Sequence, residues 1–173
     1  NLGYFSLLAA KAGAKAVYAF EPIPYTFEIL QKNIVRNHCA HCIRPFQCAI
    51  GNQNGTFSIT MNLGPKNHAD YLCGAERHPW KARRKVQVPV LRMDEFVRQE
   101  KIAEIGILKS DTEGYDFNVL LGAEETLRRF RPILIMEVHD MYLQKFHSSE
   151  AQLLEKIKEL NYKRIGENIF IPV

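Results

Sequence analysis

An apolar run that ends in an acidic residue constrains the fold of this chain more than any other feature. Residues 16–20 are apolar and are followed by Glu21 and Pro22, which predicts a strand that stops at a carboxylate. Gly3 comes before this run, and residues 4–12 between them predict a helix. A glycine turn, a helix, a strand and a terminal glutamate can together hold an adenosine, because the turn allows close approach and the carboxylate accepts hydrogen bonds from ribose hydroxyls. The alternative is that Glu21 only caps the strand.

The rest of the chain alternates between helical and strand periodicity. Residues 133–136 are all apolar, which predicts a strand buried on both faces, and Pro89 favours an edge position for its strand. Turn residues 51–55 indicate that the strands on either side form a hairpin or lie next to each other. Helices are predicted over residues 24–37, 93–101, 117–130 and 149–160, and strands over residues 43–50, 56–61, 86–91, 104–109, 133–136 and 162–171. This order predicts an α/β fold with helices on both faces of a sheet, in one domain over residues 1–173.

The composition, with 46% hydrophobic and 24% charged residues, is that of a globular protein. No apolar run approaches the roughly 18–20 residues of a membrane-spanning helix, and no basic segment leads into an apolar core as in a signal peptide. We therefore expect no membrane span and a cytoplasmic location. Because the chain opens at the glycine turn with no strand before it, we expect an N-terminally truncated fragment.

Cys39 and Cys42 form a C-x-x-C pair, with His38 and His41 beside them. A structural zinc site normally needs a second pair of ligands at a recognisable spacing, and the other two cysteines do not supply one. We expect free thiols and no disulfide scaffold, with zinc as the alternative.

Residues 62–85 show no clear period, and a loop of this length inside a compact domain usually has a function. Much of the excess in the net charge of +4 lies in this stretch, beside a tryptophan. The basic residues are Arg77, Lys81, Arg83, Arg84 and Lys85. A nucleic-acid-binding domain normally has a wider basic face, so no nucleic-acid partner is expected. We expect a substrate-recognition loop suited to an anionic group, and a solvated loop is the alternative.

Polar side chains follow the ends of three predicted strands. Ligands of open α/β sheets bind beyond the carboxyl ends of the strands, so these residues are expected to share a site. They are Glu21 after one strand, Asp111 and Glu113 after a second, and Glu137 and His139 after a third.

The segment from Lys109 to Gly114 is the densest of these clusters. A lysine and two carboxylates directly after a buried strand are costly unless they are paired or used. If the segment stays extended, Lys109, Asp111 and Glu113 share one side, and Gly114 allows a sharp turn into the next helix. The alternative is a structural ion pair with an acidic residue at a helix N-terminus.

Glu137 and His139 also share one face if extended, and the histidine could take a proton from a substrate hydroxyl or have no role. Together with Asp111 and Glu113 they could hold a divalent cation, but no spacing singles out a metal, and no metal site is predicted. The first turn lacks G-x-G-x-x-G, and neither a P-loop nor G-x-S-x-G occurs. A nicotinamide enzyme and a hydrolase therefore have little support.

Several blocks of the sequence resemble the FkbM-type methyltransferase family, and the resemblance covers nearly the whole chain. The blocks are residues 1–6 (NLGYFS), 20–22 (FEP), 93–96 (MDEF), 108–114 (LKSDTEG), 119–123 (VLLGA) and 131–137 (RPILIME). The resemblance implies a class I methyltransferase fold, Rossmann-like, with a mostly parallel sheet, helices on both faces and an antiparallel strand near the C-terminus. It also implies S-adenosyl-L-methionine as the cofactor and O-methylation of a hydroxyl on a sugar or secondary metabolite.

The resemblance further assigns cofactor-binding positions. They are Asn1, Gly3, Glu21, Pro22, Ala49, Ile50 and Asp111. Gly3 would lie under the methionine part of the cofactor, Glu21 would hold the ribose diol, and residues 49–50 would face the adenine. Two departures bear on this assignment. The acid and the glycine that the family has before Asn1 are missing, so the sheet is expected to lack a central strand, and Asn52 lies near a position where many members have an aspartate.

For catalysis we expect Asp111 or His139 as the general base, with Glu113 behind them and Lys109 as an electrostatic partner. The expected partner is a small-molecule or glycan acceptor, with an anionic group as a further expectation. Two other readings stay open at this point: a non-catalytic module that binds S-adenosyl-L-methionine, and a nicotinamide-dependent oxidoreductase.

Overall fold

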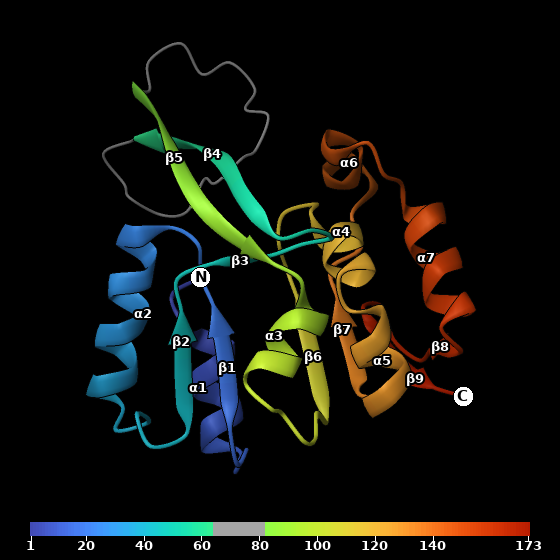
Figure 1. Cartoon of the computed structure of the whole chain (residues 1–173), viewed down its shortest axis with the longest axis horizontal. Helices are drawn as coiled ribbons and strands as arrows, with labels where there is room; N and C mark the ends of the chain where they lie inside the picture. Colours follow the sequence, from blue (N-terminus) through green and yellow to red (C-terminus); the bar gives the residue numbers. More distant parts are fainter. Residues whose placement is uncertain (64–81) are drawn as a thin grey trace. The chain divides into compact units, whose positions relative to one another are not determined.

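The computed structural model describes residues 1–63 and 82–173 and forms two compact units of helices and strands (Figure 1). Unit 1 contains Asn1–Ala49 and Gly55–Val90, and unit 2 contains Ile50–Asn54 and Leu91–Val173. Both units combine helices with strands, which confirms the predicted α/β class, whereas one domain over residues 1–173 stays a prediction. Across the described ranges, no helix has both the length and the apolar character that crossing a bilayer requires.

Unit 1 begins with two helices and a parallel pair of strands. These elements are α1 (Tyr4–Lys11), β1 (Val17–Phe20), α2 (Pro24–Arg36) and β2 (Ile43–Phe46). The strands pair in parallel with Phe20 opposite Phe46, and α2 connects them, as a parallel pair requires (Figure 1). Leu30 and Ile34 lie one turn apart on α2 and are buried, so the helical spacing read from the sequence forms this core.

The cysteines of the described residues are buried thiols. Cys39, Cys42 and Cys48 are free, as expected, and Cys73 lies outside the described residues. Burial raises the pKa of the Cys48 thiol to about 11, which keeps it protonated near neutral pH. In the part of the chain that the structure describes, no group of three or more histidine, cysteine, aspartate or glutamate residues is arranged to hold a metal ion.

The segment predicted as one strand over residues 43–50 forms two strands, with the break at residues 47–48. The second strand is β3 (Ala49–Ile50), which belongs to a sheet of order β3-β5-β4. In this sheet, β4 (Gly55–Leu63) and β5 (Ala82–Leu91) are antiparallel. Because β5 lies between β3 and β4, the predicted hairpin across residues 51–55 is wrong. The alternating pattern identified strands but not their partners.

Pro89 lies opposite Thr56 in β5, the middle strand of this sheet, so the predicted edge position is wrong. The neighbouring β3 contributes only two residues.

Unit 2 contains most of the remaining helices and a four-stranded sheet of order β6-β7-β9-β8 (Figure 1). Its elements are α3 (Met93–Gln99), β6 (Ile107–Ser110), α4 (Asp116–Leu121), α5 (Glu124–Phe130), β7 (Ile133–Met136), α6 (Asp140–Leu143), the 3₁₀ helix η1 (Gln144–Phe146), α7 (Glu150–Glu159), β8 (Tyr162–Arg164) and β9 (Ile169–Pro172). β6 and β7 are parallel, and β9 is antiparallel to β7 and to β8. The antiparallel strand near the C-terminus is thus confirmed, while a mostly parallel sheet of the class I type stays a prediction.

The core of unit 2 lies on one face of this sheet. It contains Leu108, Leu120, Ala123, Leu127, Leu134, Met136, Leu143, Leu153, Ile157, Leu160, Tyr162 and Phe170. On β7, Leu134 and Met136 are fully buried, but Ile133 is 40% exposed, so burial of this strand on both faces is wrong. Ile133 lies opposite Ile107 on the other face, and Ile107 is 61% exposed. The helices α4, α5 and α7 place their buried residues in the core on the Leu134 face.

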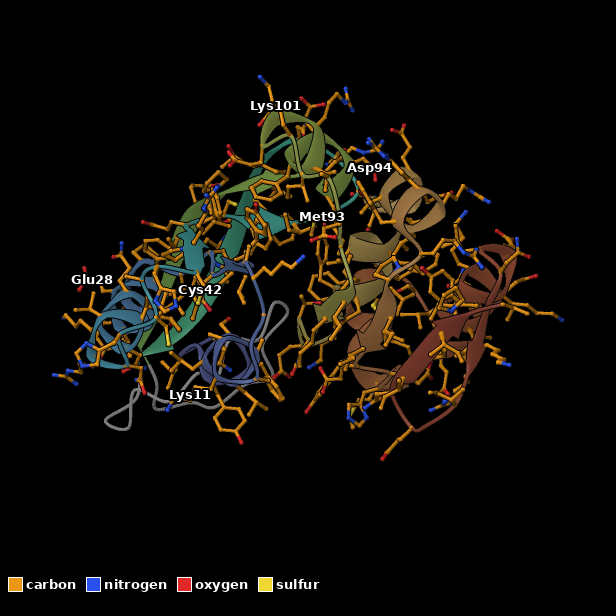
Figure 2. All side chains as sticks on the ribbon, turned by 90° about the horizontal axis from the view of Figure 1, so that it is seen from below. Lys11, Glu28, Cys42, Met93, Asp94 and Lys101 are labelled. Carbon is orange, nitrogen blue, oxygen red and sulfur yellow. The ribbon has the colours of Figure 1, made fainter. Side chains whose placement is uncertain are left out.

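The helix predicted over residues 117–130 forms two helices, α4 and α5, and Asp94 of α3, labelled in Figure 2, bonds the start of the second. In a continuous helix, the Thr126 N–H group would donate to the Gly122 carbonyl. Here the Gly122 carbonyl accepts a hydrogen bond from the Asp94 N–H group at 3.0 Å, and the Thr126 N–H group donates to Asp94 Oδ1 at 2.8 Å. A Cβ atom on Gly122 would lie 1.9 Å from the Gly51 carbonyl oxygen, so this close approach requires glycine. The apolar periodicity continues through the break, which is why the sequence pattern missed it.

Candidate functional site

The parallel pairing of β6 and β7 brings two of the predicted polar clusters together within unit 2. Ser110 lies opposite Met136 at the ends of these strands, and the Glu137 N–H group donates to the Ser110 carbonyl at 3.1 Å. Asp111 and Glu137 therefore leave the sheet beside each other. The expected convergence of polar residues at the carboxyl ends of strands is confirmed for these two clusters.

The first cluster contains an ion pair, and the second contains a close contact between a histidine and a glutamate. Lys109 Nζ lies 2.8 Å from Asp111 Oδ2, and His139 Nε2 lies 3.5 Å from Glu137 Oε1. Burial raises the pKa of Asp111, but the hydrogen bond and charge of Lys109 outweigh it and lower the pKa overall. Asp111 is thus held ionised by its ion pair with Lys109, and a catalytic role for the pair stays a prediction.

The turn that follows β6 is ordered by Asp116, which is fully buried at the start of α4. Ser110 Oγ donates to Asp116 Oδ1 at 2.5 Å, and the Thr112 N–H group donates to Oδ2 at 3.3 Å. Burial raises the pKa of Asp116, although these hydrogen bonds oppose the shift. Sequence analysis missed this residue, since an acid in the first turn of a helix is common and its buried partners are set by the tertiary fold.

Glu113 does not lie on the same extended side as Lys109 and Asp111, so that part of the prediction is wrong. The backbone leaves the extended region here, with φ of 56° at Glu113 and 105° at Gly114. Burial, followed by the negative charge of Asp111, raises the pKa of Glu113. Gly114 does make the predicted sharp turn, and a Cβ atom there would lie 2.2 Å from the Tyr142 carbonyl oxygen.

Glu137 is the carboxyl group in this cluster with the largest change in acidity. Burial, followed by the charge of Asp111 and a hydrogen bond with it, raises the pKa of Glu137 to about 7. Its Oε2 atom is buried and has no hydrogen-bond partner among the described residues. A glutamate that changes protonation near neutral pH is suited to proton transfer.

Aromatic rings from the elements after β7 and β6 lie beside these groups. The His139 and Tyr142 rings meet edge to face at 5.7 Å, and Lys145 Nζ lies 4.5 Å from the centre of the Tyr142 ring. Tyr115 and Phe146 form a second edge-to-face pair at 4.9 Å. These rings offer apolar surface next to polar groups, and no sequence period identified them because they come from short turns and helices.

In unit 1, the glycine turn has the predicted geometry. Gly3 has φ of 94°, and a Cβ atom there would lie 2.6 Å from Leu30 Cδ1. The turn therefore needs glycine both for its left-handed backbone and for its contact with α2. Asn1, the other predicted residue of this turn, is exposed.

Glu21 follows β1 and is 4% exposed. Its Oε1 atom accepts a hydrogen bond from the Ile23 N–H group at 2.9 Å, so the carboxylate does cap the end of the strand. Its Oε2 atom contacts the amino group of Asn1. Contact with a ribose stays a prediction for this residue.

The remaining predicted cofactor positions surround strand ends. Pro22 follows Glu21 and is half-buried, Ala49 is half-buried, and Ile50 is buried. Their contacts with an adenosine stay a prediction. Of the predicted recognition loop over residues 62–85, the two ends belong to β4 and β5, residues 64–81 lie outside the described residues, and Lys85 is exposed.

Comparison with protein families gives one match over most of the chain. Residues 1–164 match the model of the methyltransferase FkbM domain. Among solved structures, the FkbM methyltransferase of Methylobacillus flagellatus KT is similar with a TM-score of 0.61, at 15% sequence identity, over 97% of this chain and 40% of that one. This similarity bears on the fold alone.

Curated relatives are methyltransferases by name. The 31-O-demethyl-FK506 methyltransferase FkbM of Streptomyces tacrolimicus is 28% identical over 82% of this chain and 63% of its own length. Methyltransferase 1 of Beauveria bassiana and methyltransferase sdnD of Sordaria araneosa are each 26% identical over 72% of this chain. The chain covers 56% and 58% of their lengths, so it spans about three fifths of the relatives it matches.

Proposed function

The chain belongs to the FkbM methyltransferase domain family, and from this premise we propose that it transfers a methyl group from S-adenosyl-L-methionine to a hydroxyl of a sugar or secondary-metabolite acceptor. The observation that carries the proposal is the family match over residues 1–164. The name of the Streptomyces relative, a 31-O-demethyl-FK506 methyltransferase, supports oxygen as the accepting atom. We also propose that the acceptor carries an anionic group, because the predicted recognition loop over residues 62–85 is rich in basic residues.

The residues of unit 1 fit the adenosine end of this cofactor. The backbone at Gly3 is left-handed, and the carboxylate of Glu21 is buried at the end of β1, where a ribose hydroxyl would donate to it. When bound, S-adenosyl-L-methionine supplies a sulfonium methyl group.

The residues of unit 2 supply the proton chemistry. Asp111, which Lys109 holds ionised, would accept the proton of the acceptor hydroxyl, and His139 is the second candidate. A positioned general base contributes about 10²–10⁴-fold to such a reaction. Alignment of the reacting atoms can lower the barrier by roughly 7–11 kcal/mol more.

Replacing Glu21 by alanine is expected to weaken binding of S-adenosylhomocysteine at least tenfold, because the ribose loses its acceptor. Calorimetric titration of the unchanged chain should give micromolar affinity, or about −8 kcal/mol. Glu28→Ala is the control, since its side chain is 64% exposed on α2 and its substitution should leave the affinity unchanged. If a cooperatively folded chain binds no S-adenosylhomocysteine, the proposed cofactor is wrong for these residues.

Replacing Asp111 by alanine is expected to reduce methyl transfer about 10²–10⁴-fold while S-adenosylhomocysteine still binds. The measurement is transfer of a labelled methyl group from S-adenosyl-L-methionine to methyl glucoside, myo-inositol and catechol as hydroxyl probes. Turnover that matches the unchanged chain would remove Asp111 from the proposed mechanism. Binding of S-adenosylhomocysteine without a methylated product from any hydroxyl would favour a non-catalytic module.

A further inference from the structure

We propose that Asp111 and Glu137 share one proton and together form the proton acceptor for the hydroxyl, with His139 as the route by which the proton leaves. This inference rests on the proposed function, which assigns a base to this site but not a second carboxyl group. The inference adds Glu137 to the proposed catalytic residues. It also means that Asp111 and Glu137 gain and lose a proton together, as a pair.

The first observation is the register of the two parallel strands. Ser110 and Met136 are opposite each other, and the next residues are Asp111 and Glu137, tied by the hydrogen bond from the Glu137 N–H group to the Ser110 carbonyl at 3.1 Å. Both carboxyl groups are therefore fixed to ordered strand ends.

The second observation is an imbalance of hydrogen-bond partners. Asp111 Oδ2 is paired with Lys109 at 2.8 Å, whereas Glu137 Oε2 is buried without a partner among the described residues. An ionised carboxylate only accepts hydrogen bonds, so two neighbouring carboxyl groups can bond to each other only with a proton between them. Because Lys109 holds Asp111 ionised, the shared proton belongs mainly to Glu137.

The charges around Glu137 favour the same arrangement. The groups that face it, from both strand ends and from the turn into α4, are Asp111, Glu113, Asp116 and His139, with Lys109 beyond Asp111 and Lys145 of η1 near Glu113. After burial, the three acidic neighbours raise the pKa of Glu137 to about 7. At neutral pH the pair is thus close to its midpoint, where it can both take and release a proton.

In the proposed step, the O–H bond of the acceptor breaks and its proton passes to the Asp111–Glu137 pair, while the new C–O bond forms from the oxygen lone pair. The C–S bond breaks, and its electron pair stays on the sulfur. His139 is exposed and lies 3.5 Å from Glu137 Oε1, so it can pass the proton to water afterwards.

The test is a titration of the side-chain carboxyl groups by NMR, with ¹³C in aspartate and glutamate. One glutamate signal is expected to titrate near pH 7 and to disappear in Glu137→Gln. In Asp111→Asn, which removes the neighbouring charge but not the burial, the same signal should move to a lower pH. Glu155→Gln, at an exposed position on α7, is the matched control and should leave the titration near pH 7 unchanged.

Two outcomes would overturn the inference: a Glu137 signal that titrates near the ordinary glutamate value of about 4.3 in the unchanged chain, or one that stays near 7 in Asp111→Asn. Both readouts need neither cofactor nor acceptor, so they remain decisive if methyl transfer fails. Where transfer to a hydroxyl probe is observed, its rate should rise with pH through about 7, as the pair loses its proton. Glu137→Gln should remove that rise. Its affinity for S-adenosylhomocysteine should stay within about twofold of that of the unchanged chain, because Glu137 is not among the proposed cofactor contacts.

Discussion

Gly114→Ala is expected to lower the free energy of unfolding by about 3 kcal/mol or more and to abolish activity at the proposed site. Two effects add at this position. A side chain at φ of 105° is strained, at a cost of about 1–2 kcal/mol, and its Cβ atom would lie 2.2 Å from the Tyr142 carbonyl oxygen. The atom it meets belongs to the backbone, so a simple side-chain rotation cannot relieve the overlap.

Gly13→Ala is a matched control, because it separates the two effects. Gly13 has φ of 91°, nearly the same backbone conformation, but no atom lies within 4 Å of its added Cβ atom. Its substitution is expected to cost only the conformational strain, about 1–2 kcal/mol. Urea unfolding of both variants measures the difference. Equal losses in the two variants would show that the contact with Tyr142 is not what requires glycine at position 114.

The loss of activity in Gly114→Ala follows from where Gly114 packs. Its contact with the backbone at Tyr142 joins the turn after β6 to α6. Asp111 lies on the first of these elements, and His139 is the residue before the second. A displacement here moves the two candidate bases relative to each other, which is why the effect should exceed that of any single lost hydrogen bond.

The sequence identified the strand-end residues of this site because their position follows from periodicity alone. Lys109 and Asp111 end one apolar run, and Glu137 and His139 end another. A parallel sheet brings such ends to one edge, whatever the details of packing. Glu21 also follows an apolar run, and its carboxylate caps the end of β1.

The residues that the sequence did not identify act through tertiary contacts. Asp116 accepts a hydrogen bond from Ser110 in the buried turn. Asp94 of α3 accepts one from the Thr126 N–H group in the first turn of α5. An acidic residue near a helix start gives no sign of which donor it will meet. The strand partners were missed for the same reason: residues 51–55 have turn chemistry, but the strand that pairs with β4 comes from much later in the chain.

Asp94→Ala is also expected to lower the free energy of unfolding by about 3 kcal/mol. The carboxylate is 5% exposed and makes two contacts, accepting from the Thr126 N–H group at 2.8 Å and from Arg92 Nη2 at 3.0 Å. Alanine leaves the Thr126 N–H group buried without an acceptor at the start of α5, and removal of a helix cap alone costs about 1 kcal/mol. The bond from the Asp94 N–H group to the Gly122 carbonyl is kept, since it uses only the backbone.

Two further variants make this prediction specific to the carboxylate oxygens. Asp94→Asn keeps an oxygen that can accept from the Thr126 N–H group and should lose only about 1 kcal/mol, because the partner charge of Arg92 is half exposed. Glu95→Ala removes the neighbouring acid, whose ion pair with Arg98 is on the surface, and should change stability by about 0.5 kcal/mol or less. Urea unfolding gives the three values, and hydrogen exchange of the Thr126 amide should speed up in Asp94→Ala alone. If Asp94→Ala loses no more stability than Glu95→Ala, then the separation of α4 from α5 does not depend on the Asp94 carboxylate, and the close approach of Gly122 to Gly51 would have to account for it.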